Sequence, residues 1–183
     1  MIIVGTVLIA FLLTSSPIIM ADQTDPRLDT LFARLHTTDD AHDAARVTNL
    51  IWAIWHQSDD DDVNELMRRG LTEMSAQDYP AAVRTFGEII DIDPEFAEAW
   101  NKRATVHYLM GEYGASVKDI DRTLELEPRH FGALSGLGLI MTAMGNDEAA
   151  IAAFEATLSV HPFAGGARQN LETLRERQKK RSL

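Results

Sequence analysis

Six histidines and a run of aspartates are the side chains of this sequence best suited to binding a metal ion. No two histidines have the spacing with which a helical zinc motif presents its ligands; they are His36, His42, His56, His107, His130 and His161. Asp59–Asp62 lack the alternating ligands, central glycine and closing glutamate of a calcium-binding loop. The chain has no cysteine, which excludes thiolate ligands and disulfides. We therefore expect neither a metal site nor a cofactor.

The acidic run has a simpler interpretation as the beginning of a helix. Asp62 is expected to cap that helix, with Glu65 completing a capping box, and the other aspartates favour the positive end of the helix dipole. The sequence also lacks a serine nucleophile elbow, a phosphate-binding glycine loop and a dinucleotide-binding motif. No set of residues has the spacing of a known catalytic arrangement, so we expect a protein that is not an enzyme.

The spacing that does recur along the chain is thirty-four residues. Prolines, aromatic or branched residues, small residues and apolar residues all return at this interval. The columns in register are Pro94, Pro128 and Pro162; Phe86, Ile120 and Phe154; Ala82, Ser116 and Ala150; Leu66, Trp100 and Leu134; Gly70, Ala104 and Gly138; and Tyr79, Tyr113 and Asp147. So many columns with one interval indicate a tandem structural repeat.

Each repeat is predicted to form two helices joined by a short turn. The turns are marked by Gln77-Asp78, Gly111-Glu112 and Gly145-Asn146, and the prolines end each unit because proline cannot continue a helix. The predicted helices are 63–76, 79–92, 97–110, 113–126, 131–144 and 147–160. The small residues are expected to let paired helices approach, while the aromatic and branched column fills the space between hairpins.

This pattern resembles the tetratricopeptide repeat (TPR), whose signature places Trp, Leu-Gly and Tyr on a first helix and Ala, Phe and Pro on a second. The second unit supplies Trp100, Ala104, Tyr108, Tyr113 and Pro128, and the third supplies Leu137, Gly138, Ala150, Phe154 and Pro162. The resemblance extends over residues 63–164 and implies stacked helical hairpins. Residues 100–104 and 128–133 are also similar to exported TPR proteins of Gram-negative bacteria.

The predicted fold class is an all-α TPR solenoid with helical flanks. Residues 26–37 and 41–56 are expected to form a degenerate helical pair, in which Trp52 and Trp55 belong to the core with Leu50 and Ile51. The predicted organisation is residues 1–21, signal peptide or membrane anchor; 22–62, degenerate helical pair and acidic linker; 63–164, three repeats at 63–96, 97–130 and 131–164; and 165–183, capping helix and basic tail. Leu171 and Leu174 give that last helix one apolar face.

The first residues of the chain are apolar and uncharged. Met1–Leu13 is an unbroken apolar run, and Pro17 precedes a small residue, Ala21, after which a signal peptidase would cut. We expect export to the bacterial periplasm. The alternative is a retained membrane anchor, although the unbroken run is shorter than the roughly 18 residues of a spanning helix.

The resemblance implies a concave groove lined by the first helix of each repeat. Carried over to this chain, the lining is Asn64, Met67, Arg68, Leu71 and Met74, then Asn101, Lys102, Thr105 and Tyr108, then Gly132, Ser135, Gly136, Leu139 and Thr142. Asn101 is expected to bond a peptide backbone, and Arg68 and Lys102 to attract a carboxylate. Co-chaperone TPR domains bind a C-terminal carboxylate, but here Met67, Leu71, Gly132 and Gly136 replace four of the binding groups, so that activity is not expected.

Two further features depart from simple helical patterning. Gly132 and Gly136 lie on one face of a predicted helix, where each glycine costs about 1 kcal/mol relative to alanine. The two interpretations are a strip on which the backbone of a partner lies closely, and close packing within the protein. Arg69 and Arg103 stand where the family has an apolar residue, and we expect internal ion pairs with Glu73 and Asp119, or a ligand carboxylate as their partner.

The net charge of −11 disfavours binding to nucleic acid. Basic residues gather only after Arg168, where they complement the negative end of a helix or contact an anionic membrane. We expect the chain to be a non-catalytic scaffold or adaptor that binds a peptide or protein partner in the cell envelope. The alternative is a permanent structural or assembly subunit of a larger envelope complex.

Overall fold

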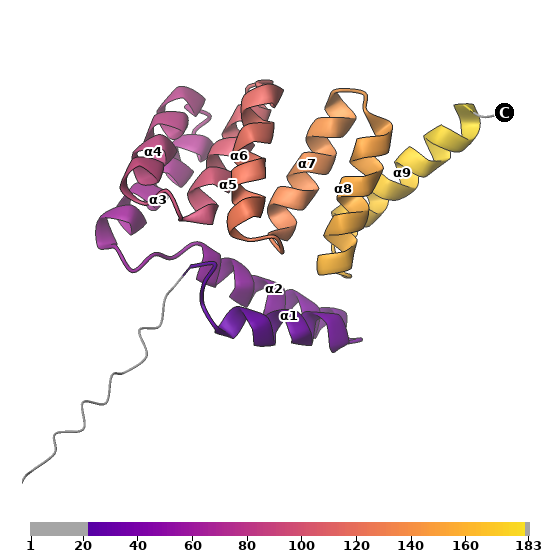
Figure 1. The fold of residues 1–183 in the computed structure, drawn as a ribbon, viewed down its shortest axis with the longest axis horizontal. Coiled ribbons are helices and arrows are strands. Elements are labelled where there is room, and N and C mark those ends of the chain that lie inside the picture. The colour runs from indigo at the N-terminus through magenta and orange to yellow at the C-terminus, as the bar shows by residue number, and fades with distance from the viewer. Residues whose placement is uncertain (1–21, 182–183) are drawn as a thin grey trace, which may run out of the picture.

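The computed structural model describes residues 22–181, and within that range the secondary structure is entirely helical (Figure 1). The predicted segment 1–21 lies outside the described residues. The helices are α1 (Arg27–Thr37), α2 (Ala41–Trp55), α3 (Asp61–Ser75), α4 (Tyr79–Ile92), α5 (Ala97–Leu109), α6 (Tyr113–Leu126), α7 (Phe131–Ala143), α8 (Asp147–Val160) and α9 (Gly165–Arg181). No helix in this range is both long enough and apolar enough to cross a bilayer.

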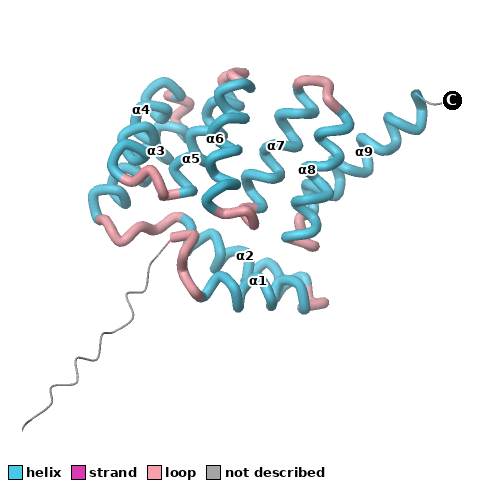
Figure 2. Tube along the Cα trace, viewed as in Figure 1, coloured by secondary structure: helices cyan, strands magenta, loops and turns pink. Residues whose placement is uncertain are grey.

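Helices α3 to α8 form three antiparallel hairpins that stand side by side, which confirms the predicted solenoid (Figures 1 and 2). Their bounds agree with the predicted helices to within a residue or two. The predicted capping box at Asp62 is wrong. The side chain of Asp60 accepts hydrogen bonds from the backbone N–H groups of Asp62 and Val63, so α3 begins earlier, and Glu65 pairs with Arg68 instead.

The turns within the hairpins share one backbone conformation. Gly111 and Gly145 both have φ near +77°, and Gln77 occupies the equivalent place with φ near +60°. Glycine adopts this left-handed conformation without the steric cost that a side chain brings. A residue in this left-handed conformation therefore ends the first helix of each hairpin, and the second helix runs antiparallel to the first.

A small residue on the first helix of each hairpin faces a large residue on the second. A Cβ added to Gly70 would lie 2.6 Å from the ring of Phe86, and a Cβ added to Gly138 would lie 2.5 Å from the ring of Phe154. In the middle hairpin the residue on the first helix is larger than glycine, namely Ala104, and the residue on the second helix is smaller than phenylalanine, namely Ile120. These two residues lie in one core. The two columns therefore complement each other in volume within each hairpin.

The N-terminal hairpin forms as predicted but does not continue the stack. Helices α1 and α2 lie across the lower ends of the repeat helices in Figure 1. Their core includes Phe131 of α7, and Val160 and Phe163 pack against it. A hydrogen-bonding contact of 2.9 Å joins Thr48 Oγ1 to His161 Nε2. The sequence could not predict this position, because α1 and α2 carry no copy of the repeated columns.

The tryptophans of α2 lie in this interface, as expected, whereas a neighbouring leucine does not. Trp55 is fully buried and stacks on the imidazole of His130, with ring centroids 4.2 Å apart. Trp52 is partly buried against the same core. The sequence pattern places Leu50 in the core, but this residue is half exposed, since it lies on the outer face of α2 beside α1.

Helix α9 covers the open side of the last hairpin. Leu171 and Leu174 are buried against Phe154 and Ala150, as the sequence predicts. Several of the basic residues of α9 are engaged by acidic residues of α8: Arg175 pairs with Glu155, and Arg177 and Arg181 both pair with Asp147. The basic end of the chain is therefore partly neutralised by the helix it covers.

The size complementarity within the hairpins predicts a mutational cycle. Gly138→Ala should destabilise the protein by about 1–3 kcal/mol, because the new methyl group overlaps the ring of Phe154. Adding Phe154→Ile should recover part of this loss, because it rebuilds the Ala–Ile pair of the middle hairpin. Urea unfolding measures both effects. The control is Gly136→Ala, whose Cβ meets only Ile120 Cδ1 at 3.5 Å and which should stabilise the helix slightly. Equal effects at the two glycines would contradict this explanation.

Candidate functional site

A pocket of about 320 Å³ opens between α5 and α7. It brings together most of the groove residues predicted on these two helices: Asn101, Thr105, Tyr108, Gly132, Ser135, Gly136 and Leu139. The structure adds five more lining residues, Ala104, Leu109, Ser116, Ile120 and Ile140. Ser116 and Ile120 belong to α6, so the second helix of the repeat forms the floor of the pocket.

Gly136 faces this pocket, and packing within the protein does not require a glycine at this position. A Cβ at this position would make only an ordinary contact with Ile120, so an alanine would fit. Gly138, two residues later, has no such room beside Phe154. The absence of a side chain at Gly136 therefore contributes to the space inside the pocket, which is consistent with the hypothesis of close approach by a partner.

Gly132 has a different explanation. A Cβ there would lie 2.5 Å from Cη2 of Trp52, a residue of α2. The internal interpretation of the glycine pair therefore holds for Gly132, because a tryptophan of the same chain already lies against it. The two glycines of the predicted strip therefore differ. Both line the pocket, but Gly132 is packed against Trp52 of the N-terminal hairpin, whereas Gly136 has free space beside it.

A second pocket, of about 710 Å³, lies between α2 and α3. It contains four further residues predicted for the groove, Asn64, Met67, Arg68 and Leu71. Met67 is buried, so it contributes mainly to the core of the first hairpin. Met74 lines neither pocket and packs against the same core. The other wall comes from α2 and the linker after it, namely Asn49, Trp52, Ala53, His56, Gln57 and Ser58.

A buried carboxylate, Glu98, lies where α5, α7 and the end of α2 meet. It is 1% exposed. Its Oε1 lies 2.9 Å from Lys102 Nζ and 3.1 Å from His56 Nε2, at ion-pair distances rather than in well-aligned hydrogen bonds. Its Oε2 accepts a hydrogen bond from Asn101 Nδ2 and lies 2.9 Å from His130 Nε2. We call these five residues the Glu98 cluster.

The hydrogen bonds of His130 indicate its tautomer. Its Nδ1 accepts a hydrogen bond from the backbone N–H of Ala133 and so caps α7. The ring proton must therefore be on Nε2, which donates to Glu98. His130 thus fixes the start of α7, the helix that carries Gly132 and Gly136, relative to α5.

The groups around Glu98 favour its ionised form. Burial by itself would raise this pKa, but Lys102, His130 and His56 outweigh the cost of burial and lower the pKa to about 2. Glu98 therefore remains ionised at neutral pH although it is sealed from water. A buried charge of this kind is stable only while its partners remain in place.

The cluster changes the roles predicted for two groove residues. Lys102 is predicted to attract a carboxylate, but its ammonium is bound to Glu98 and lies 5.2 Å from the ring centroid of Trp52. Asn101 is predicted to offer both amide groups to a peptide, but its Nδ2 donates to Glu98. The Lys102 ammonium and one amide hydrogen of Asn101 are therefore engaged within the protein.

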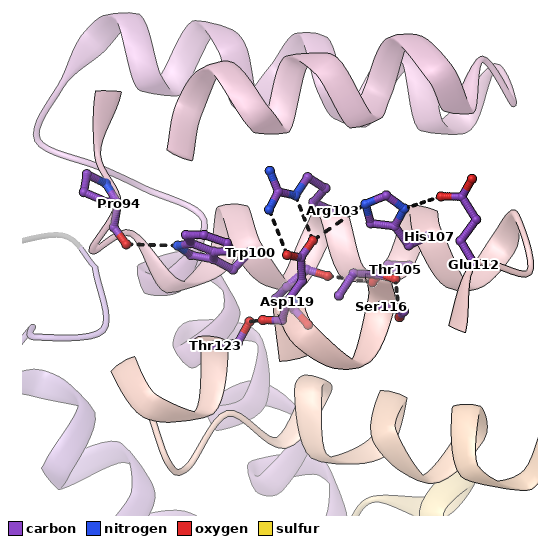
Figure 3. A network of polar contacts seen from close by, with 11 residues as sticks. Pro94, Trp100, Arg103, Thr105, His107, Glu112, Ser116, Asp119 and Thr123 are labelled. Atoms are coloured by element: carbon purple, nitrogen blue, oxygen red, sulfur yellow. Dashed lines mark hydrogen bonds and ion pairs between the residues drawn. The ribbon is translucent and has the colours of Figure 1, made fainter. Parts of the chain in front are cut away.

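The two unusual arginines form internal ion pairs, as predicted. Arg103 makes two bonds to Asp119, Nε to Oδ2 at 2.7 Å and Nη2 to Oδ1 at 2.8 Å, and His107 lies on the other side of that carboxylate (Figure 3). The guanidinium of Arg103 also stacks on Trp100, whose indole N–H donates to the carbonyl of Pro94. Arg69 pairs with Glu73 and Glu88. These contacts brace α5 against α6 and α3 against α4.

Sequence reasoning missed Glu98 and the part that α2 plays in the second pocket. The four-residue spacing of Glu98 and Lys102 was an available signal, since such pairs meet on one face of a helix. The contact with His56 had no signal, because α2 lies outside the repeats. His130 lies within the second repeat, but the neighbouring repeats have Phe96 and Ala164 at its position, so no column marks it. Among residues 22–181, no group of three His, Asp or Glu side chains is placed to hold a metal ion.

Glu98 is predicted to stabilise the fold in a pH-dependent manner. Because its folded-state pKa is below the ordinary value of 4.5, its contribution is complete above about pH 5 and is lost as the pH falls toward 2. Glu98→Gln should lower the free energy of unfolding by about 3 kcal/mol near neutral pH. This deficit should shrink as unfolding is measured at lower pH.

The matched control for that experiment is Glu95→Gln. Glu95 is exposed and pairs with Arg122 at the surface, so its substitution should change stability by less than about 1 kcal/mol. A deficit for Glu98→Gln that is no larger than this, or that does not vary with pH, would contradict the role given to the cluster.

Comparison with known proteins agrees with the repeat architecture. The chain matches the tetratricopeptide repeat family at residues 67–120 and 102–168. A TPR repeat-containing protein of Rhizobium etli is 35% identical over 85 residues, which are 46% of this chain and 42% of the relative. The chain therefore matches less than half the length of that relative.

Solved structures share the fold at low sequence identity. The TPR domain of Sgt2 from Aspergillus fumigatus has a TM-score of 0.64 at 19% identity, covering 67% of this chain and 83% of that domain. The first TPR domain of Spaghetti (RPAP3), bound to the HSP90 peptide SRMEEVD, has a TM-score of 0.62 at 19% identity, covering 64% of this chain and 93% of that domain. With the family match extending over all three hairpins, the chain belongs to the tetratricopeptide repeat family.

Proposed function

We propose that this protein is a non-catalytic adaptor that holds a segment of a partner protein in the pocket between α5 and α7. The observation that carries the proposal is the pocket itself, about 320 Å³ in volume, with Gly136 on its wall. Packing does not require glycine there, and a glycine inside a helix is unfavourable, so its presence is explained by the space it leaves. The RPAP3 domain, which shares this fold, holds a peptide.

The second pocket supports the same proposal. It lies between α2 and α3, on the lining formed by the first helices of the repeats, and Trp52 belongs to its wall while also packing on Gly132. A segment that leaves the α5–α7 pocket would pass this tryptophan toward α3. The N-terminal hairpin therefore contributes a wall that the repeats do not provide.

We further propose that the adaptor acts in the cell envelope. The support is the apolar, uncharged segment Met1–Leu13 followed by Pro17 and Ala21, which has the pattern of an export signal. The alternative is that this segment stays attached and anchors the protein to a membrane.

The binding proposal predicts that filling the pocket removes the partner. Gly136→Leu should leave the helical fold intact and abolish capture of the partner by crosslinking in the source cells. Gly114→Leu is the matched control: a Cβ added to Gly114, on α6, would meet no atom within 4 Å, and this residue does not line the pocket. Capture that is equal for the two variants would contradict the proposal. A partner that survives salt washing at fixed stoichiometry would indicate a permanent subunit rather than an adaptor.

The localisation proposal predicts a shortened mature chain. Mass spectrometry of the protein from its source cells should find Asp22 as the first residue, because the predicted cleavage follows Ala21. An intact first segment in a membrane fraction would favour the anchor instead. An intact chain recovered only from the cytoplasm would exclude both forms of the proposal.

A further inference from the structure

Helix α7, which forms one wall of the α5–α7 pocket, contains no charged residue. Its sequence from Phe131 to Ala143 is FGALSGLGLIMTA. The residues it presents to the pocket are small, hydroxylic or apolar, among them Ser135 and Leu139. This wall therefore offers no counter-ion to a charged group of a partner.

Helix α5, the opposite wall, does carry charges, but each of those near the pocket is engaged within the protein. Lys102 is bound to Glu98. Arg103 is bound to Asp119 by two hydrogen bonds. His107 bonds Glu112 through Nδ1. None of these side chains lines the pocket, so a charged group entering it would lose its hydration without gaining an ion pair.

Three of the polar side chains in the lining form hydrogen bonds within the protein, whereas the hydroxyl groups of Tyr108 and Ser135 add polar but uncharged surface. Thr105 Oγ1 donates to the carbonyl of Asn101, and Ser116 Oγ donates to the carbonyl of Ala104. Asn101 donates one of its two amide hydrogens to Glu98. At the rim, by contrast, Leu109 and Leu139 are 48% and 37% exposed, one from each wall. The pocket thus has an apolar rim and an uncharged interior.

From this charge distribution we infer the chemical class of the segment that the pocket selects. It is an internal, uncharged stretch of polypeptide that inserts an apolar side chain against Gly136. Segments with Asp, Glu, Lys or Arg at that position, and segments that enter with a free C-terminal carboxylate, are rejected. This inference rests on the proposed function and adds to it the chemical class of the segment that is bound.

The selectivity follows from desolvation. A carboxylate or ammonium group moved from water into an uncharged pocket meets no compensating charge, which is strongly unfavourable. An apolar side chain gains from the same transfer. The net charge of −11 adds a longer-range repulsion against acidic segments. The structure therefore discriminates by excluding charge rather than by recognising it.

The test is a selection from two random peptide libraries on the purified protein, one with a blocked C-terminus and one with a free C-terminus. Selected peptides are synthesised in acid and amide forms, and their affinities are measured by fluorescence anisotropy. The same assay is repeated with the central apolar residue changed to Asp or Lys, and with SRMEEVD as an acidic, carboxylate-terminated probe. Each peptide is also measured against Gly136→Leu and, as a matched control, Gly114→Leu.

The selected peptides should carry an uncharged, apolar centre and bind equally in acid and amide forms, to within about twofold. A central Asp or Lys should weaken binding at least about tenfold, SRMEEVD should not bind, and binding should be lost with Gly136→Leu alone. Peptides that require a free carboxylate or a charged centre, yet depend on Gly136, would overturn this inference and leave the binding proposal standing. If no selected peptide depends on Gly136, both are overturned.

Discussion

The close contact between a small residue and a ring inside each hairpin is the constraint on which the rest of the structure depends. Gly70 and Gly138 have no Cβ because Phe86 and Phe154 occupy that space, and the middle hairpin meets the same requirement with Ala104 and Ile120. Because each hairpin closes in the same way, the hairpins can stack side by side. The stack in turn places α5 and α7 as the two walls of one pocket.

The Glu98 cluster adds a polar constraint to this apolar framework. The buried carboxylate of Glu98, on α5, contacts His130, the residue before α7, and His56, the residue after α2. Such a buried group is favourable only in one arrangement, since any displacement separates it from its partners. The cluster therefore fixes where the N-terminal hairpin sits. It also binds the ammonium of Lys102, so this cation is engaged within the protein rather than offered to the carboxylate of a ligand.

These two constraints together give the pocket its character. Charged side chains of the first helices form ion pairs within the protein, and the pair of Arg103 with Asp119 is the most direct of them (Figure 3). What remains on the surface of the α5–α7 pocket is uncharged, with leucines at the rim and a glycine on the wall. A repeat stack can thus present an uncharged pocket although the chain as a whole is strongly acidic.

The sequence by itself determined the repeats, because columns such as Pro94, Pro128 and Pro162 record contacts that recur between neighbouring helices. It also predicted most of the residues of α5 and α7 that line the pocket, and the pairing of Arg103 with Asp119. Only the tertiary structure decided where α1 and α2 lie, why position 132 is a glycine, and that the carboxylate of Glu98 is buried. Those depend on contacts that do not recur from one repeat to the next, such as Trp52 with Gly132 and Glu98 with His130, and such contacts leave no regular spacing in the sequence.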